Sequence, residues 1–469
     1  MRRAGRGLLR ELPKTKPGQD GSGGGSPASL AGQPGQRRDS GRNARSAQRI
    51  DHVDSYYAAS ANAAPGRPPL EDDIAPEVCI VGGGFTGLSA GIELAERGLQ
   101  VVLLEAARVG WGASGRNGGQ LVNGLSASLE TIERRCGIAG VSIVLEAGRE
   151  LRALIERHRI DCDLTPGCLF AAMTPGQMRE LEHRDALWRR HGFQGFVLLD
   201  RAGMRSHVAS DAYLGGMADS SGGHVHPLNL ALGEAAALER LGGVIHERSP
   251  VTEVSNVAGQ PVLRIGRVVV RPRILVLAGN AYLGHLMPEI EDRIMPFSTQ
   301  VLATEPLGDR AAALIPSGYC VEDERYIQDY YRMSADGRLI FGGGAVFGGS
   351  EPADIRRKLL PHLHAVFPEL RGVAIDFTWS GNCAISFSRI PQLGQLGPAS
   401  FFAQGFSGHG IVGSHLYGRL IAEAAAGERE RFDVFAQVPW SRFPGGRRFA
   451  APYTMLGSWW YAMRDTFNL

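Results

Sequence analysis

The most regular pattern in the chain is a short apolar run, a glycine-rich turn and an amphipathic segment, in that order. Residues 77–81 (EVCIV) predict a buried strand, and 88–98 carries apolar residues at helical spacing. The next apolar run, 100–104 (QVVLL), predicts a second strand. A strand, a helix and a further strand within one short stretch are typical of a parallel sheet covered by helices.

The turn between the first strand and the helix reads GGGFTG at 82–87 and has the spacing G-x-G-x-x-G. In this spacing Gly82 permits the tight turn, Gly84 lets the backbone approach a pyrophosphate, and Gly87 lets the helix pack closely on the strand. Glu105, 18 residues after Gly87, ends the second strand, where an acid suits hydrogen bonding to ribose hydroxyls. The pattern predicts a dinucleotide site, and spacing alone does not separate NAD from FAD.

Weaker periodicity predicts the other elements. The expected helices cover 140–160, 175–192 and 226–241, and the expected strands cover 213–217, 273–277 and several runs within 296–346. A second glycine-dense run, FGGGAVFGG at 341–349, is assigned to a strand and turn because no amphipathic helix with a terminal acid follows it.

Composition separates the first fifty residues from the rest. They carry 11 Lys and Arg against three acids, a net charge of +8, so the remaining chain carries +2 minus 8, or −6. Because this segment is also rich in Gly, Pro and Ser, residues 1–54 are predicted to form a disordered basic tail. The acidic body argues against nucleic acid as a partner. No run of 18 apolar residues occurs, so we expect no transmembrane segment.

Cysteine and histidine usage bears on metals and location. The six cysteines show no CxxC pair and no zinc-finger spacing, which favours free thiols and a cytoplasmic location. His224 and His226 would share one face of an extended segment, but no third ligand is indicated nearby. No metal site is therefore predicted, and His226 before Pro227 is expected to open a helix.

Four blocks of the chain resemble the FAD-dependent amine and amino-acid oxidases with the D-amino-acid oxidase fold. The blocks are AARVGWGASGRNGGQL at 106–121, GGHVHPL at 222–228, ILVLAGN at 274–280 and QGFSGHG at 404–410. Longer matches, including SYYAASANA at 55–63 and YCVEDERY at 319–326, resemble the branch of this family that oxidises gamma-glutamylputrescine. The resemblance begins at Ser55 and leaves the basic tail outside.

The resemblance implies an α/β fold in which a Rossmann-like FAD-binding domain, built from separated segments, is interleaved with an α+β substrate domain that has an antiparallel sheet. The expected FAD-binding segments are 76–140, 223–285 and 379–430, the expected substrate-domain segments are 141–222 and 286–378, and 431–469 is expected to form a C-terminal extension.

FAD is the cofactor that the resemblance implies. The residues expected to contact it are Gly82, Gly84, Phe85, Thr86, Gly87, Glu105, Ser114, Gly115, Arg116, Asn117, Gly118, Gly119, Gln120, Val254, Gly279, Gly408, His409 and Gly410.

The implied activity is oxidation of a primary amine by FAD, with gamma-glutamylputrescine as the expected substrate. It would give gamma-glutamyl-aminobutyraldehyde, ammonia and hydrogen peroxide, with molecular oxygen or another electron acceptor as the second partner. Two alternatives stay open: a secondary-amine or amino-acid oxidase or dehydrogenase of the sarcosine or glycine type, and a flavin-binding protein without turnover.

Five residues are candidates for chemistry on the substrate. His409 is expected at the flavin, at the start of a helix whose positive end stabilises reduced flavin. Tyr331 and Trp379, with Tyr330 next to Tyr331, offer aromatic faces for an alkylamine, and core packing is an equal alternative. Arg332 could bind a substrate carboxylate, or it could be a surface arginine.

Two departures from the family bear on the substrate and the acceptor. No arginine follows Trp379 in WSGNC, so an amino-acid substrate lacks its expected anchor. Lys358 is the sole lysine of the predicted folded body and is expected on a solvent-facing helix, so activation of oxygen by a lysine is not predicted.

Overall fold

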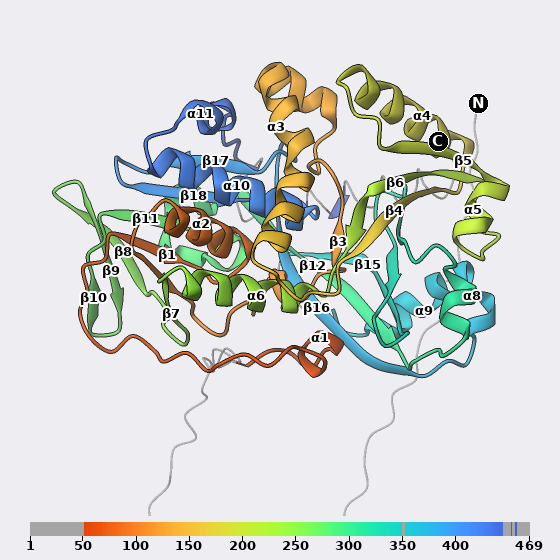
Figure 1. The fold of residues 1–469 in the computed structure, drawn as a ribbon, viewed down its shortest axis with the longest axis horizontal. Helices are drawn as coiled ribbons and strands as arrows, with labels where there is room; N and C mark the ends of the chain where they lie inside the picture. Colours follow the sequence, from red (N-terminus) through yellow and green to blue (C-terminus); the bar gives the residue numbers. More distant parts are fainter. Residues whose placement is uncertain (1–50, 349–351, 444–451, 453–454, 457–469) are drawn as a thin grey trace, which may run out of the picture. The chain divides into compact units, whose positions relative to one another are not determined.

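The computed structural model of the chain describes residues 51–348, 352–443, 452, 455 and 456. Most of the predicted tail 1–54 and the end of the predicted extension 431–469 therefore lie outside the described residues. The described residues form a single compact unit. Its described part contains three β-sheets and the helices that pack on them (Figure 1).

A six-stranded sheet forms the dinucleotide half of the fold. All neighbouring strands are parallel except β17 and β18. In spatial order the strands are β17 (Gln392–Gln395), β18 (Ser400–Gln404), β11 (Ile274–Leu277), β1 (Val78–Val81), β2 (Val101–Leu104) and β7 (Val244–His246). The central strand β1 is buried along its whole length, which explains its uninterrupted apolar run. The predicted Rossmann-like sheet from separated segments is confirmed.

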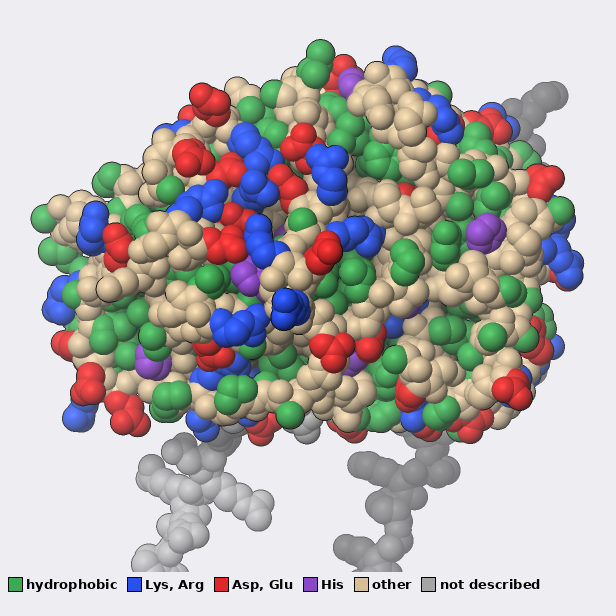
Figure 2. All heavy atoms as spheres, in the orientation of Figure 1, with side chains coloured by type: hydrophobic (Ala, Val, Ile, Leu, Met, Phe, Trp, Pro, Cys, Tyr) green, Lys and Arg blue, Asp and Glu red, His purple; other side chains and the backbone are tan. Residues whose placement is uncertain are grey.

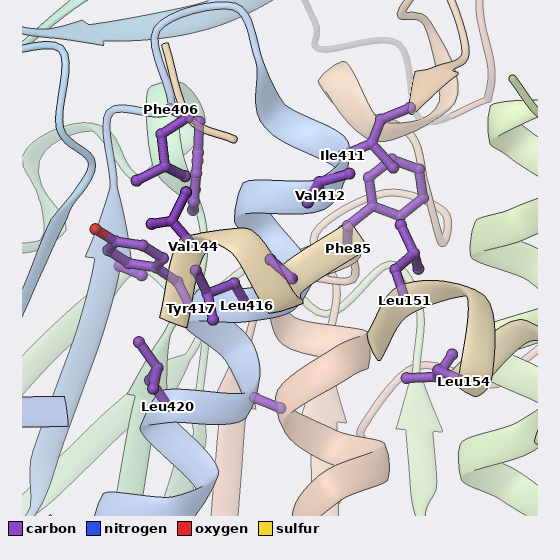
Figure 3. Packing of buried hydrophobic residues seen from close by; sticks show 14 of the residues in the cluster. Phe85, Val144, Leu151, Leu154, Phe406, Ile411, Val412, Leu416, Tyr417 and Leu420 are labelled. Carbon is purple, nitrogen blue, oxygen red and sulfur yellow. The ribbon is translucent and has the colours of Figure 1, made fainter. Parts of the chain in front are cut away.

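Helices α2 (Phe85–Glu96) and α10 (Gly410–Ala425) lie against each other over this sheet. A Cβ at Gly418 would come within 2.9 Å of the Ala90 nitrogen and 2.8 Å of the Thr86 oxygen, so glycine permits the close approach of the two helices. Helix α3 (Leu129–Arg157) packs on α10, and Figure 3 shows Val144 of α3 and Leu416 of α10 in the shared core. The start of α2 is thus supported by the close packing of α2 on α10.

Helix α3 begins earlier than the predicted 140–160. Ser128 caps it by accepting a hydrogen bond from the Thr131 N–H, and Gly137 interrupts the helical dihedrals with φ of 68°. The interruption hides the first segment from a search for continuous periodicity. The other two predicted helices are confirmed as α4 (Pro175–Arg190) and α6 (Pro227–Arg240).

A nine-stranded sheet forms the other half of the fold. Its strands are β16 (Ile375–Ser386), β12 (Ile294–Thr304), β15 (Leu339–Phe347), β14 (Tyr330–Met333), β13 (Cys320–Asp323), β4 (Thr165–Ala172), β6 (Gly215–His224) and β3 (Gln120–Leu121), with β5 (Phe196–Asp200) paired to β6. The expected antiparallel sheet is present, but β13 and β4 run parallel. The glycine-dense run at 341–349 lies largely in strand β15, as predicted.

The nine-stranded sheet has two different faces. Helix α9 (Ile355–Val366) supplies Leu359 and Leu363 to a core on one face, with α5 (Arg201–His207) and α8 (Arg310–Leu314) beside it. On the other face Val301 and Trp379 pack with the short helix α1 (Tyr56–Ala59). This second face is the one that meets the glycine-rich loop at 106–121.

A small antiparallel sheet of β8 (Glu253–Val257), β9 (Gln260–Ile265) and β10 (Val268–Val270) completes the fold at the left of Figure 1. Charged side chains of both signs alternate over the face in Figure 2. Among the described residues no helix is long and apolar enough to span a bilayer.

Candidate functional site

Five parallel strands end at the same edge of the six-stranded sheet, and the loops that follow β1, β2, β11 and β18 meet there. The Gly82 N–H donates to the Leu104 oxygen at 2.9 Å, which ties the turn after β1 to the end of β2. The Ala278 N–H donates to the Val81 oxygen at 2.8 Å, and Gly279 follows. The Gly405 N–H donates to Asn280 Oδ1 at 2.9 Å. Hydrogen bonds therefore connect the loops at this edge of the sheet.

The glycines after β1 are required by close contacts. Gly82 has φ of 113°, and a Cβ there would lie 2.8 Å from the Ala278 oxygen. A Cβ at Gly87 would lie 2.0 Å from the Gly82 oxygen, so a side chain would push helix and strand apart. A Cβ at Gly84 would lie 2.8 Å from Ser114 Oγ. The turn forms a cradle that side chains would fill.

The start of helix α2 is held by the neighbouring loop. Gly84 is the N-cap, and Ser114 Oγ accepts a hydrogen bond from the Phe85 N–H at 3.0 Å. Thr86 and Gly87 complete the first turn, where backbone N–H groups and the positive end of the helix dipole favour a phosphate. Ser114 lies in the 3₁₀ turn 113–115 of the loop after β2. Two loops far apart in sequence thus meet at the phosphate-binding end of α2.

Glu105 has both carboxylate oxygens fixed by the backbone. Its Oε2 accepts the Gly83 N–H at 2.7 Å and its Oε1 accepts the Ala107 N–H at 2.8 Å. Burial raises the pKa of Glu105, although these two donors lower it. Each oxygen retains a second lone pair, so the carboxylate is preset to accept ribose hydroxyls.

The loop at 106–121 is shaped by its own polar side chains. Asn117 Nδ2 donates to the Ala113 and Ser114 oxygens at 3.0 Å, and its Oδ1 accepts the Gly119 N–H at 2.8 Å. The Arg116 guanidinium lies 4.4 Å from the centroid of the Trp111 ring, and its Nε donates to the Trp111 oxygen. These two side chains build the loop, and any contact with the flavin stays a prediction.

The sheet face beside this loop carries an aromatic wall. Trp379 Nε1 donates to the Arg116 oxygen at 2.9 Å, and the Tyr57 ring stands edge-on to Trp379 with centroids 5.1 Å apart. A Cβ at Gly118 would lie 2.6 Å from the Tyr330 ring. Gln120 Nε2 donates to the Val321 oxygen at 2.8 Å. The loop is thus clamped between the dinucleotide sheet and the nine-stranded sheet.

Residues 77–424 match the family model described as DAO, FAD dependent oxidoreductase. The chain belongs to the DAO family. It is 48% identical to gamma-glutamylputrescine oxidoreductase of Escherichia coli over 89% of this chain and 100% of that protein. It is 36% identical to the probable oxidoreductase OrdL of Haemophilus influenzae over 89% of this chain and 98% of that protein.

Solved structures show the same fold. Glycine oxidase of Geobacillus kaustophilus superimposes with a TM-score of 0.69 at 23% identity and covers 78% of this chain and 98% of its own. L-proline dehydrogenase of P. horikoshii gives a TM-score of 0.67 at 19% identity, with 77% and 96% covered. The chain is accordingly an FAD-dependent oxidoreductase of the DAO family, and the glycine cradle, the start of α2 and Glu105 fit an FAD pyrophosphate and ribose.

A third loop, which leads from β18 into helix α10, reaches the same edge of the sheet. Ser407 and Gly408 have φ of 58° and 103°, and this left-handed turn places His409 at the N-cap. His409 Nε2 lies 3.5 Å from Glu322 Oε2 of strand β13. Burial lowers the pKa of His409, but the charge of Glu322 and the contact with it outweigh burial, so this pKa lies above its ordinary value.

One predicted substrate residue is wrongly placed. Tyr331 points into the core under α9, where its hydroxyl lies 2.8 Å from that of Tyr213 and its ring stacks on Phe341. Side chains alternate along a strand, so the neighbouring Tyr330 takes the face toward the loop at 106–121. Tyr331 therefore does not line the candidate site.

Arg332 shares the face of Tyr330 but is already engaged. Its Nε donates to the Gly118 oxygen at 2.8 Å, its Nη1 to the Met333 oxygen at 3.1 Å and its Nη2 to the Tyr57 hydroxyl at 3.2 Å. It is 3% exposed. This geometry makes Arg332 a support of the loop, and its predicted contact with a substrate carboxylate is not supported by these contacts.

The remaining predicted cofactor residues lie in three places: the loop at 106–121, strand β8 and the start of α10. A Cβ at Gly119 would lie 2.2 Å from the Val225 oxygen, and Gly115 packs on Gly110 in the same loop. Val254 lies in β8, half-buried against the apolar cluster that contains Leu104. Gly410 starts α10. Their contacts with FAD stay predictions.

The two neighbouring histidines serve different local roles. His226 Nδ1 accepts the Asn229 N–H and caps α6, as expected, and burial lowers its pKa to about 4. His224 Nε2 lies 3.1 Å from the Gly318 oxygen, and burial lowers its pKa to about 3. Within the described ranges no group of three or more His, Cys, Asp or Glu side chains is placed to hold a metal ion.

Sequence reasoning missed Glu322 and Tyr57. Both lie in blocks that carry the family resemblance, YCVEDERY and SYYAASANA. Glu322 is masked in the sequence by the acids Asp323 and Glu324 that follow it, so no local pattern sets it apart. Tyr57 carries no local signal either, because it precedes the dinucleotide fold and reaches the site through helix α1.

Proposed function

We propose that the chain oxidises the terminal primary amine of gamma-glutamylputrescine to the imine, which water then hydrolyses to gamma-glutamyl-aminobutyraldehyde and ammonia. The observation that carries this proposal is the 48% identity that spans the whole of the gamma-glutamylputrescine oxidoreductase of E. coli. Bound FAD would supply the two-electron acceptor for the amine carbon. The residues of the chain then have to orient that carbon and exclude water.

The aromatic wall suits this task. Tyr330, partly exposed beside the loop at 106–121, would contact the four-carbon chain of putrescine, and the buried Trp379 and Tyr57 support Tyr330 from the same cluster. His409 lies at the positive end of α10 and adds a group with a raised pKa. Both features favour an alkylamine chain and a flavin that gains negative charge on reduction.

The electron acceptor in the proposal is molecular oxygen, with hydrogen peroxide as the product, or another acceptor. Lys358 is exposed on α9, which packs on the sheet face opposite the aromatic wall. This position supports the prediction that a lysine does not assist oxygen. A cytoplasmic location is also part of the proposal and is supported by six cysteines without disulfides.

Anaerobic stopped-flow reduction of the purified FAD-loaded protein tests the function. Gamma-glutamylputrescine is compared with putrescine, sarcosine and glycine, and the loss of flavin absorbance is followed. Rapid reduction by gamma-glutamylputrescine alone is the expected result. Reduction only by sarcosine or glycine would assign the protein to the secondary-amine or amino-acid class, and no reduction by any amine would indicate a flavin-binding protein without turnover.

A further inference from the structure

We propose that Glu322 binds the ammonium group of the amine substrate and makes the site selective for cationic amines over α-amino acids. This inference deepens the proposed function and rests on it. The sequence patterns did not single out Glu322. The inference follows from the position of its carboxylate, from its few hydrogen bonds and from the groups that surround it.

Glu322 lies where three parts of the candidate site converge. It pairs across the strands with Tyr330, whose ring contacts the position of Gly118 in the loop at 106–121. The preceding residue, Val321, accepts the Gln120 amide of the same loop. His409, at the start of α10, approaches from the third side. Glu322 is therefore on the sheet face that meets both flavin-associated loops.

The carboxylate is buried and under-bonded. Glu322 is 5% exposed, and its Oε2 makes no well-formed hydrogen bond to any of the residues that the structure describes. Its ion-pair contact is His409 Nε2, at 3.5 Å, which is longer than a charge-assisted hydrogen bond. A buried carboxylate is costly unless a cation or several donors satisfy it. The open lone pairs of Oε2 are suited to an N–H donor from a ligand.

The charge at this position selects the ligand. Besides His409, the groups that feel the Glu322 charge are Tyr330 of β14 and Cys168 of β4, both neutral at physiological pH. Arg184 is near His409 but is engaged in a two-bond ion pair with Glu324. A protonated alkylamine would supply the cation and the N–H donor that the Glu322 carboxylate lacks, whereas Glu322 would repel the carboxylate of an α-amino acid.

The contact with His409 makes binding of the ammonium group to Glu322 depend on whether His409 is protonated. When His409 is protonated it shares the carboxylate, and an incoming ammonium group must compete with it. When His409 is neutral the carboxylate is available to the amine. The terminal amine of the proposed substrate, with an ordinary amine pKa near ~10, remains cationic over the range in which His409 titrates.

The test measures equilibrium binding to the FAD-loaded enzyme. The ligand is the gamma-glutamyl amide of an alkyldiamine with two methyl groups on the carbon that would be oxidised, which removes the C–H bond and prevents turnover. The matching alcohol is the neutral probe. Perturbation of the flavin absorption spectrum reports the dissociation constants of wild type, Glu322→Gln and Glu322→Asp.

For Glu322→Gln we expect amine affinity to fall by about 10- to 100-fold, as for a lost charge-assisted hydrogen bond, with little change for the alcohol. Glu322→Asp keeps the charge and should retain part of the preference for the amine over the alcohol. It also tests the proposal if Glu322→Gln fails to bind FAD. The matched control is Glu130→Gln, which alters an exposed carboxylate that pairs with His183 at 2.6 Å and should bind both ligands like wild type.

A Glu322→Gln enzyme that binds the amine within twofold of wild type, and still prefers it over the alcohol, would overturn the proposal. Failure of the proposed function is a separate outcome. If gamma-glutamylputrescine does not reduce the wild-type flavin but another primary amine does, the substrate assignment is lost. The comparison of wild type with Glu322→Gln is then made with the hindered analogue of that amine.

Discussion

At the scale of single residues, the two carboxylates of the site differ in how they are satisfied. Glu105 accepts two backbone N–H groups, at 2.7 and 2.8 Å, which fix its orientation. Glu322 is buried with one long contact to a histidine. The first arrangement suits a resident cofactor, and the second suits a ligand that comes and goes.

Replacing Glu105 by Gln should weaken FAD binding by about tenfold or more, because the amide NH₂ faces one of the two N–H donors that now hold the carboxylate. The dissociation constant of FAD, measured by fluorescence quenching on reconstitution, checks this. The control is Glu253→Gln, an exposed residue of β8 paired loosely with Arg264. Equal FAD affinity in wild type and Glu105→Gln would contradict the assigned role.

The raised pKa of His409 gives substrate affinity a definite pH dependence. Below this pKa the imidazolium occupies Glu322, and above it the neutral ring releases the carboxylate, so affinity for the cationic amine should rise with pH and then level off. Titrations with the unreactive amine between about pH 6 and 9 measure the profile. His409→Asn should flatten it. A wild-type profile that falls with pH would exclude this competition.

Tyr331→Phe separates packing from chemistry. The change removes one buried hydroxyl contact with Tyr213 and should lower the free energy of unfolding by about 1 kcal/mol. The anaerobic rate of flavin reduction should stay at the wild-type value, because the ring points away from the candidate site. Chemical denaturation and stopped-flow reduction measure the two effects. A large drop in the reduction rate would restore Tyr331 as a substrate residue.

At the scale of elements, a feature can be predicted from the sequence when the residues that determine it are close together in the chain. The strand, turn and helix at 77–98 are encoded by adjacent residues, and the structure contains them. The face taken by Tyr330 or Tyr331 depends on the pairing of β14 with β15, which no local pattern marks. The contact between Glu322 and His409 joins residues 87 positions apart and required the assembled fold.

The close packing of α2 on α10 makes Gly418 sensitive. An alanine would place its Cβ 2.8 Å from the Thr86 oxygen and 2.9 Å from Ala90 and Ser89 atoms, so Gly418→Ala should destabilise the fold by about 1–3 kcal/mol. Thermal unfolding measures the loss. Gly176→Ala in α4, where the nearest atom to a new Cβ is 3.6 Å away, is the control and should be neutral or slightly stabilising. Equal melting temperatures for the two variants would refute the packing argument.

At the scale of the whole molecule, the six-stranded sheet joins residues 78–104, 244–277 and 392–404. The separated-segment architecture was predictable only through the family resemblance, since local periodicity gives strands without their order. The boundaries expected between the two domains stay predictions. Strand β3, at residues 120–121, pairs with β6 in the nine-stranded sheet although it follows directly on the dinucleotide loops.

Ion pairs link helices α3, α10 and α11 (Glu430–Ala436) on the surface. Glu150 contacts Arg419 at 3.0 Å and Arg431 at 3.4 Å, and Glu423 contacts the same two arginines. Glu150→Gln should cost about 0.5–1 kcal/mol of unfolding free energy at low salt and less at ~1 M salt, because these half-buried pairs still reach solvent and are partly screened. Urea unfolding at the two ionic strengths checks this. A loss that does not shrink with salt would point to packing.

The hydrogen bond from the Phe85 N–H to Ser114 Oγ has a consequence for how the enzyme acquires its cofactor. The dinucleotide turn and the loop at 106–121 are tied together by groups of the chain itself, so we expect little conformational entropy to be lost when FAD binds. More of the interaction energy is then expressed as affinity. Newly synthesised apoprotein should capture FAD by docking it onto a preset surface, without a coupled folding step.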